Sequence, residues 1–153
     1  MKVTMMLADA AQAVQGKLYI LGGGWSTAGP DPTPMAIAIK VEVPWDEANR
    51  PHRLKLALVD GDGQPVIVPT ATGDRPLELG AEFEVGRPPG LRPGTPLDLP
   101  LAMNLGPLPL QPDRRYVWRL SIDDHSEEDW QVSFSTRPAQ GPGPVRGTLP
   151  PST

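Results

Sequence analysis

The feature that most constrains this chain is the alternation of apolar and polar residues along several separate segments. In the longest of them, every second residue from Leu97 to Leu105 is apolar. The same period of two runs through residues 3–7, 36–43, 53–58, 79–85, 116–122 and 130–134. This period is typical of β-strands that bury one face, because successive side chains point to opposite sides of a strand. The alternation therefore predicts a protein built from strands.

Helical periodicity is nearly absent. The best candidate is one turn in the segment PWDEANR, where Pro44 ends a strand and Asp46 is placed to cap a short helix. Glycine and proline clusters separate the strands at intervals of roughly ten residues. We therefore predict an all-β fold, a single antiparallel β-sandwich of about eight or nine strands, either Ig-like or C2-like. Pro96 and Pro100 place the Leu97–Leu105 strand at a sheet edge, because proline cannot donate a ladder hydrogen bond.

The domain organisation follows from length and pattern. The chain has 153 residues, enough for one domain with its own core. We assign residues 1–136 to the β-sandwich domain. Residues 137–153, RPAQGPGPVRGTLPPST, have no apolar pattern, and we expect a disordered tail rich in proline and glycine.

Composition excludes several classes of function. The net charge of −4 argues against a nucleic-acid-binding surface, which needs a basic stripe. The chain has no cysteine, so disulfides, thiolate chemistry and cysteine-ligated zinc are excluded. The N-terminal apolar run ends at Asp9 after about six residues, too short for a signal peptide, and no segment reaches the length of a membrane span. We expect a soluble cytoplasmic protein that binds neither nucleic acid nor membrane.

Three consecutive glycines, Gly22 to Gly24, raise the question of a phosphate-binding loop. A dinucleotide-binding loop needs the spacing G-x-G-x-x-G at the start of a helix. Here the third glycine position is Thr27, and the prolines that follow would break a helix. The glycines are better explained by a strand that bulges or turns a corner, where a Cβ atom would clash. We therefore predict a bend and no nucleotide cofactor.

Two acidic segments are candidates for a cation site. Asp60 and Asp62 lie in DGDG, which departs from the calcium loop of EF-hands at its later positions and is better explained as a hairpin turn. Asp123 and Asp124 begin the acidic run DDHSEED between two strong strands. Such a run is usually a solvated loop. Our main prediction is that the chain holds no metal; the alternative is a calcium site of the C2 type made by these four aspartates.

Catalysis is not predicted. The chain has only two histidines, His52 and His125, and it lacks the G-x-S-x-G and H-E-x-x-H motifs. Glu82 and Glu84 share one strand face and are expected to be solvated. We assign no catalytic residue and predict that the protein is not an enzyme; an enzyme whose residues meet only in the folded chain is the less favoured alternative.

The four tryptophans fall into two pairs. Trp118 and Trp130 lie on the apolar faces of strands, and we expect both in the core. Trp25 and Trp45 lie in irregular segments next to glycine or proline. A loop tryptophan can anchor a partner or a sugar ring, or it can plug one end of a sandwich. Trp25 and Trp45 are therefore our candidate contact residues for a partner or ligand.

The N-terminal segment MLADAAQAVQGKLYILGGGW resembles the start of an uncharacterised bacterial family of small β-sandwich proteins. The residues that carry the likeness are Gly16, Lys17, Leu18, Ile20, Leu21 and Gly22. The resemblance extends to WQVSFSTRP, so that it covers residues 1–137. It implies one β domain from a bacterium, and it implies no catalytic residue.

These observations favour a non-catalytic protein-interaction or structural module that binds a protein partner or associates with itself. The alternative is a module that binds a small ligand or calcium through the acidic loops or the loop tryptophans.

Overall fold

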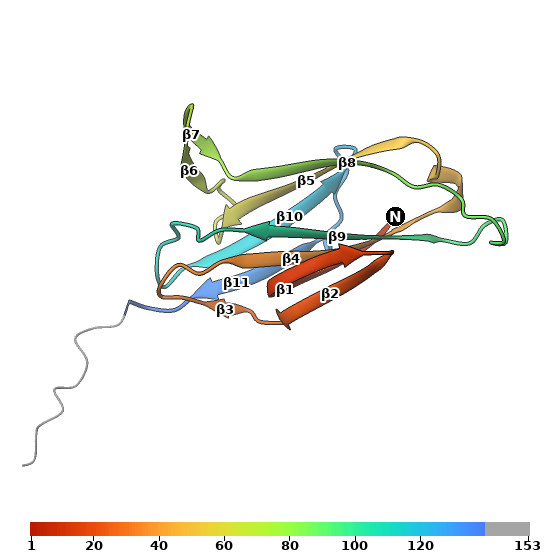
Figure 1. Cartoon of the computed structure of the whole chain (residues 1–153). Coiled ribbons are helices and arrows are strands. Elements are labelled where there is room, and N and C mark those ends of the chain that lie inside the picture. The colour runs from red at the N-terminus through yellow and green to blue at the C-terminus, as the bar shows by residue number, and fades with distance from the viewer. Residues whose placement is uncertain (140–153) are drawn as a thin grey trace, which may run out of the picture.

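The computed structural model describes residues 1–139 of the chain, and the region predicted to be a disordered tail lies outside the described residues from position 140 onward (Figure 1). The described part contains eleven strands and one 3₁₀ turn. In chain order they are β1 (Lys2–Val14), β2 (Lys17–Gly23), β3 (Thr27–Ala28), β4 (Met35–Val43), η1 (Trp45–Glu47), β5 (Pro51–Asp60), β6 (Ile67–Thr70), β7 (Gly73–Pro76), β8 (Glu78–Glu84), β9 (Leu97–Leu105), β10 (Arg115–Ile122) and β11 (Gln131–Thr136).

Nine of these strands form two facing sheets. One sheet has four strands in the order β2-β1-β4-β9, and the other has five in the order β3-β11-β10-β5-β8. All neighbours are antiparallel except β3, which runs parallel to β11. The order β11-β10-β5 opposite β4-β9 is that of strands G, F and C opposite B and E in immunoglobulin-like domains. The all-β sandwich prediction is confirmed, and the strand order is that of its Ig-like form.

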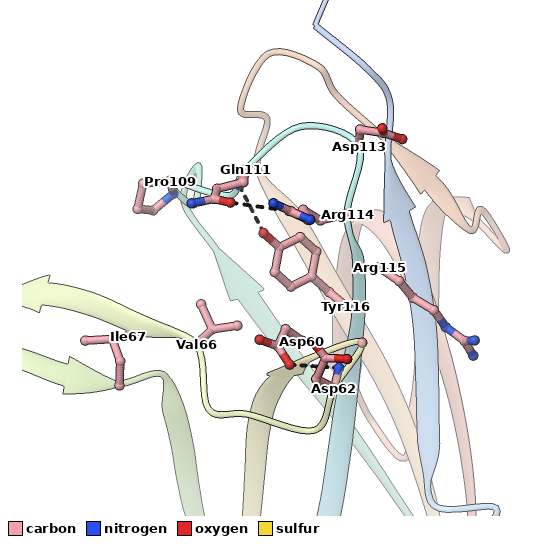
Figure 2. A pocket seen from close by; sticks show the side chains of 11 residues that line it. Asp60, Asp62, Val66, Ile67, Pro109, Gln111, Asp113, Arg114, Arg115 and Tyr116 are labelled. Carbon is pink, nitrogen blue, oxygen red and sulfur yellow. Dashed lines mark hydrogen bonds between the residues drawn. The ribbon is translucent and has the colours of Figure 1, made fainter.

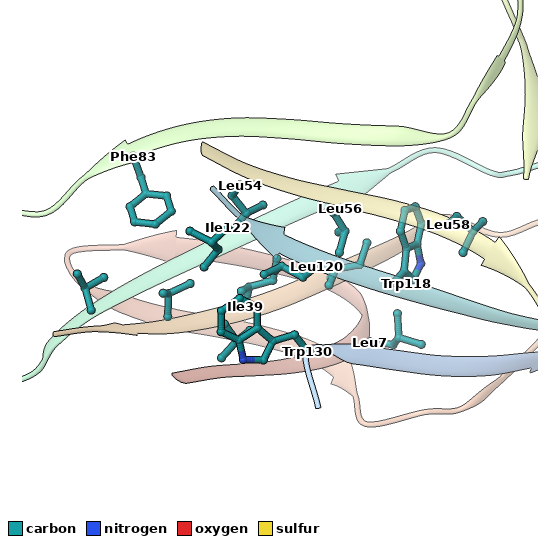
Figure 3. Packing of buried hydrophobic residues seen from close by; sticks show 14 of the residues in the cluster. Leu7, Ile39, Leu54, Leu56, Leu58, Phe83, Trp118, Leu120, Ile122 and Trp130 are labelled. Atoms are coloured by element: carbon teal, nitrogen blue, oxygen red, sulfur yellow. The ribbon is translucent and has the colours of Figure 1, made fainter. Parts of the chain in front are cut away.

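The core lies between the two sheets. Figure 3 shows Leu7 and Ile39 from the four-stranded sheet packing toward Leu56, Trp118 and Leu120 from the five-stranded sheet, and all five side chains are buried. The apolar members of each alternating series point inward because the pleat sends every second side chain to the same face. Trp118 and Trp130 are both buried, as the sequence predicts.

A tyrosine near the start of β10 fixes the connection that precedes the strand. The hydroxyl oxygen of Tyr116 accepts a hydrogen bond from the backbone N–H of Gln111 at 3.0 Å. A tyrosine at the start of strand F that bonds to backbone a few residues upstream is the tyrosine corner of immunoglobulin-like sandwiches. This contact supports the Ig-like assignment independently of strand order.

The glycine bend is confirmed. Gly22 and Gly24 have φ angles of +60° and +90°, which L-residues with a Cβ rarely adopt. The bend takes the chain from β2 in the four-stranded sheet to β3 in the five-stranded one. The edge position of β9 is confirmed as well.

Two local expectations need correction. Asp46 makes no cap; Pro44 precedes η1, and no side chain bonds the first turn. The DGDG turn does form, since Val66 returns to bond Leu58, but the chain then leaves the sheet as the separate β6–β7 hairpin. Figure 1 shows this hairpin standing away from the two sheets. Across residues 1–139 there is no helix whose length and apolarity would let it span a membrane.

Candidate interaction surface

The β1–β2 hairpin is formed by a two-residue turn. Gln15 and Gly16 have φ angles of +50° and +74°, the signs that a type I′ turn requires. Such a turn fixes the register, and the structure pairs Val14 with Lys17 and Ala11 with Ile20. In a two-residue hairpin the residues that flank the turn form a hydrogen-bonded pair, so bonded and non-bonded pairs alternate from there. The pair Ala11–Ile20 is therefore of the non-hydrogen-bonded kind.

Asn104 of β9 supplies independent support for this alternation. The N–H of Ala11 donates to Oδ1 of Asn104 at 3.2 Å, and Nδ2 of Asn104 donates to the Ala11 carbonyl at 2.8 Å. The polar backbone groups of Ala11 thus point away from β2. By the same geometry, the N–H and carbonyl of Ile20 point away from β1, toward the open edge of the sheet. The groups of Leu18, two residues away, point the same way.

One face of the hairpin packs on the outside of the four-stranded sheet. The contact consists of small residues, which allow close approach. The buried members are Ala8, Ala11, Ala36 and Ala38, with Leu18 and Ala102 packed against them. This packing and the bonds to Asn104 hold the hairpin to its own sheet.

The other side of the hairpin is apolar and exposed. Tyr19 is 58% exposed and Leu21 is 72% exposed. Ile20 lies on the opposite face of β2, beside Ala11, and is 40% exposed. We call Met6, Val14, Tyr19, Ile20 and Leu21, all exposed large hydrophobic residues, the hairpin patch. A groove of about 580 Å³ runs along it, lined by residues that include Tyr19, Ile20 and Leu21. Exposed apolar residues that cluster in this way mark interaction sites more often than singly scattered ones.

The other three edges of the two sheets are protected against a further strand. β3 is two residues long and is followed by three prolines. β8 carries Glu78, Glu82 and Glu84, and β9 contains Pro100. Short length, charge and proline are the usual protections of an edge strand. β2 has seven residues, no proline and a single charged residue, Lys17, at its end.

The two candidate tryptophans are partly buried and face core residues or an arginine. Trp25 packs edge-on against Phe134, with ring centroids 6.0 Å apart. Trp45 lies in η1 under the guanidinium of Arg87, whose carbon is 4.7 Å from the ring centroid. A cavity of about 530 Å³ borders Trp45, with Met1, Pro44 and Pro96 among its walls. The structure does not bring the two tryptophans into one site.

The four candidate aspartates lie in two places. Asp60 pairs with Tyr116 at one end of the β5–β10 pair, whereas the backbone N–H of Asp123 bonds to Arg53 at the other end. Arg53 and Asp60 are seven positions apart along β5, which is roughly 23 Å. The structure therefore does not bring the four carboxylates together. Among residues 1–139, no three His, Cys, Asp or Glu side chains are grouped to hold a metal ion.

Asp60 and Asp62 instead border a polar cleft of about 590 Å³ (Figure 2). Oδ1 of Asp60 accepts hydrogen bonds from the backbone N–H groups of Asp62 and Gln64, both at 2.9 Å. Gln111 and Arg114 lie across the cleft and bond to each other. One Asp60 oxygen is thus used in shaping its own turn.

At the opposite end, a buried histidine joins two loops. Nδ1 of His52 is 2.6 Å from Oδ2 of Asp123, and Nε2 is 2.8 Å from the Glu47 carbonyl. Burial pushes the pKa of His52 down, but the bonds to the Glu47 carbonyl and to Asp123 outweigh it and raise that pKa above its ordinary value. The N–H of Arg53 and the ring of His52 lower the pKa of Asp123.

Neither the contact of His52 with Asp123 nor the hairpin patch was predicted from the sequence. His52 begins an alternating strand, but its partner Asp123 is 71 residues away, and nothing local indicates their contact. A signal for the patch was present in KLYILGG, where four consecutive apolar residues from Leu18 to Leu21 break the alternation. A strand that is apolar on both faces and lies at an edge exposes one of them.

The comparisons with known proteins give one finding. The model of a family described as "Family of unknown function (DUF6941)" matches residues 3–134. No curated protein and no solved structure is significantly similar to the chain.

Proposed function

This chain belongs to the family of unknown function DUF6941, and we propose that it is a non-catalytic protein-binding module that docks an extended segment of its partner along the free edge of β2. The observation that carries the proposal is the contrast between β2 and the other sheet edges. β2 alone among the four edges combines length, exposed apolar side chains and the absence of proline. An added strand gains main-chain hydrogen bonds from the edge and contacts from alternate side chains.

The chemistry of the edge supports a protein rather than a small molecule as partner. The backbone groups of Leu18 and Ile20 point outward in the spacing of a strand ladder. Tyr19 and Leu21 lie on the same face of β2, where a neighbouring strand places its own side chains. Aromatic residues such as Tyr19 are enriched at protein interfaces. The bacterial source and the cytoplasmic location stay predictions of the sequence.

Site-specific crosslinking in cells tests this function. A photoreactive benzoylphenylalanine replaces Tyr19 in one variant and Ile67, on the separate β6–β7 hairpin and 54% exposed, in the control. We expect a discrete crosslinked protein species, with the second chain identified by mass spectrometry, from position 19 and not from position 67. If position 19 gives no more crosslinked protein than position 67, the β2 edge is not a docking site.

The polar cleft beside Asp60 supports a second candidate function, the binding of a small polar ligand. Carboxylates, two arginines and the Gln111 amide line it together. A ligand at a hundred times its Kd stabilises a protein by about 2.7 kcal/mol. A melting-temperature panel of sugars, nucleotides and amino acids, compared between wild type and Asp62→Ala, tests this. A rise in melting temperature that Asp62→Ala abolishes supports ligand binding in the cleft. If no compound changes the melting temperature, the cleft is not a binding site for these ligands, and only the proposal of protein binding stands.

A further inference from the structure

We propose that the strand which docks on β2 is β2 of a second copy, so that the protein forms a two-fold symmetric dimer with the two Ile20 residues opposite each other. This inference rests on the proposed function, because it names the partner of the same edge. Its support comes from three properties of β2: the direction of its backbone groups, the order of its side chains and the position of its charges.

The backbone groups fit a two-fold axis at Ile20. The N–H and carbonyl of Ile20 both point to the open edge, as shown by the Ala11 bonds to Asn104. In an antiparallel ladder, two residues whose polar groups point at each other exchange both hydrogen bonds. Ile20 and its symmetry mate can therefore form such a pair. Leu18 then lies opposite Gly22 of the second copy, where the φ of +60° at Gly22 begins the bend and ends the regular ladder.

The side chains fit this register. With Ile20 on the axis, Tyr19 lies opposite Leu21 of the second copy, and the symmetric pair repeats the contact. These pairs are of the non-hydrogen-bonded kind, in which side chains come closest. Contact between these two exposed side chains removes apolar surface from water, which is favourable. The two most exposed members of the hairpin patch are thus the two that cover each other.

The charges fit as well. Lys17, the only charged residue of β2, would lie beside the glycine bend of the second copy, where no charged residue of β2 faces it. The two Lys17 residues lie at opposite ends and do not repel each other.

Pairing of β2 with another edge of a second copy is less suitable. It would place the apolar β2 residues beside the glutamates of β8 or the proline of β9. Pairing of two identical strands about a two-fold axis gives a closed dimer, whereas pairing of unlike edges gives rings or open arrays of more chains. The favoured product is one continuous sheet in which two four-stranded sheets join at β2.

A disulfide test uses the absence of native cysteine. In the proposed dimer the two Cα atoms at position 20 are about 5.5 Å apart, within the range of a disulfide. We expect Ile20→Cys to give a covalent dimer on mild oxidation. The matched control is Lys17→Cys in the same strand, whose two copies would lie roughly 20 Å apart and should stay uncrosslinked. Equal crosslinking of both variants, or of neither, overturns the register.

Sedimentation equilibrium tests the association itself. We expect wild type and the control Ile67→Lys to have twice the chain mass at micromolar concentration, and Leu21→Lys to have the mass of one chain. Circular dichroism of every variant confirms that the β fold is retained.

The outcomes separate this inference from the proposed function. A monomeric wild type whose position 19 crosslinks a different protein overturns the self-association and leaves the docking edge intact. A dimer that persists in Leu21→Lys uses another surface and overturns the inference. A monomer without crosslinks at position 19 overturns both.

Discussion

His52 and Asp123 are joined by a hydrogen bond of 2.6 Å between Nδ1 and Oδ2, although 71 residues separate them in the chain. The second ring nitrogen of His52 faces the Glu47 carbonyl at 2.8 Å. A carboxylate and a carbonyl both accept hydrogen bonds, so both ring nitrogens are satisfied only when both carry a proton. The folded chain therefore favours the imidazolium form of a histidine that is buried and stacked on Phe83. This pair ties the β4–β5 connection to the β10–β11 loop.

The first prediction concerns pH. The folded-state pKa of His52 is raised above 6.5, so its contribution to stability is complete below pH 6.5 and is lost as pH rises through the folded-state value. The pKa of Asp123 is lowered from 3.8, so its contribution is complete above pH 3.8 and is lost as pH falls through the folded-state value. We expect the pair to stabilise most between these two limits. Urea unfolding of wild type and Asp123→Asn from pH 4 to 9 measures this.

Asparagine is the suitable replacement because Asp123 has a φ of +52°, which asparagine tolerates. Since half of the Asp123 side chain is exposed, we expect a loss of only about 1 kcal/mol near pH 5.5. The loss should shrink as pH rises above neutrality. Parallel stability curves for the two proteins over the whole range would contradict the assignment.

The second prediction concerns the tyrosine corner. Tyr116→Phe removes the hydroxyl that bonds the N–H of Gln111 and keeps the ring stacked on Phe134. We expect the free energy of unfolding to fall by about 1 kcal/mol. Tyr19→Phe is the control, because Tyr19 is exposed, and it should leave the free energy of unfolding unchanged. Both are measured by urea titration at one protein concentration. An unchanged midpoint for Tyr116→Phe would show that the corner adds nothing.

The third prediction concerns Trp25. Its indole N–H is buried without an acceptor among the residues that the structure describes. Trp25→Phe removes this unpaired donor, which stabilises the fold, and part of the ring contact with Phe134, which destabilises it. Because the two effects oppose each other, we expect the free energy of unfolding to change by no more than about 1 kcal/mol. Trp25→Ala leaves a cavity and should cost about 2–3 kcal/mol. Comparable losses in the two variants would mean that the N–H has a partner in solution.

The fourth prediction concerns the β6–β7 hairpin. Val66 and Leu77 flank it, and the N–H of Leu77 donates to the Val66 carbonyl at 2.8 Å. Every residue from Ile67 to Pro76 except the half-buried Val68 is exposed. Replacing 67–76 with Asn-Gly, which favours a two-residue hairpin turn, should therefore change the free energy of unfolding by less than about 1 kcal/mol. A loss of several kcal/mol, measured by urea titration, would show that the hairpin supports the sandwich.

Much of the fold could be predicted from the sequence. The Leu97–Leu105 strand has the predicted bounds, and Trp118 and Trp130 lie in the core that the alternation implied. Alternation works as a predictor because the direction of a side chain in a strand depends only on its place in the pleat. The candidate residues were less predictable, since Trp25 and Trp45 occupy separate places and the aspartates lie at two ends of one strand pair.

The sequence by itself determined the alternating strands, their buried faces and the bend at Gly22 and Gly24, because each of these depends on local backbone geometry. It also determined the edge position of β9, because proline cannot donate a ladder hydrogen bond. Only the tertiary structure decided that β2 lies at an edge. β2 is exposed because the β1–β2 hairpin is held to β9 through Ala11 and Asn104, residues 93 positions apart. His52 is protonated more readily because Asp123 is brought to it from a distant loop. Strand order depends on pairing between segments that are far apart in the sequence, and no repeating pattern of residues along the chain indicates which segments pair.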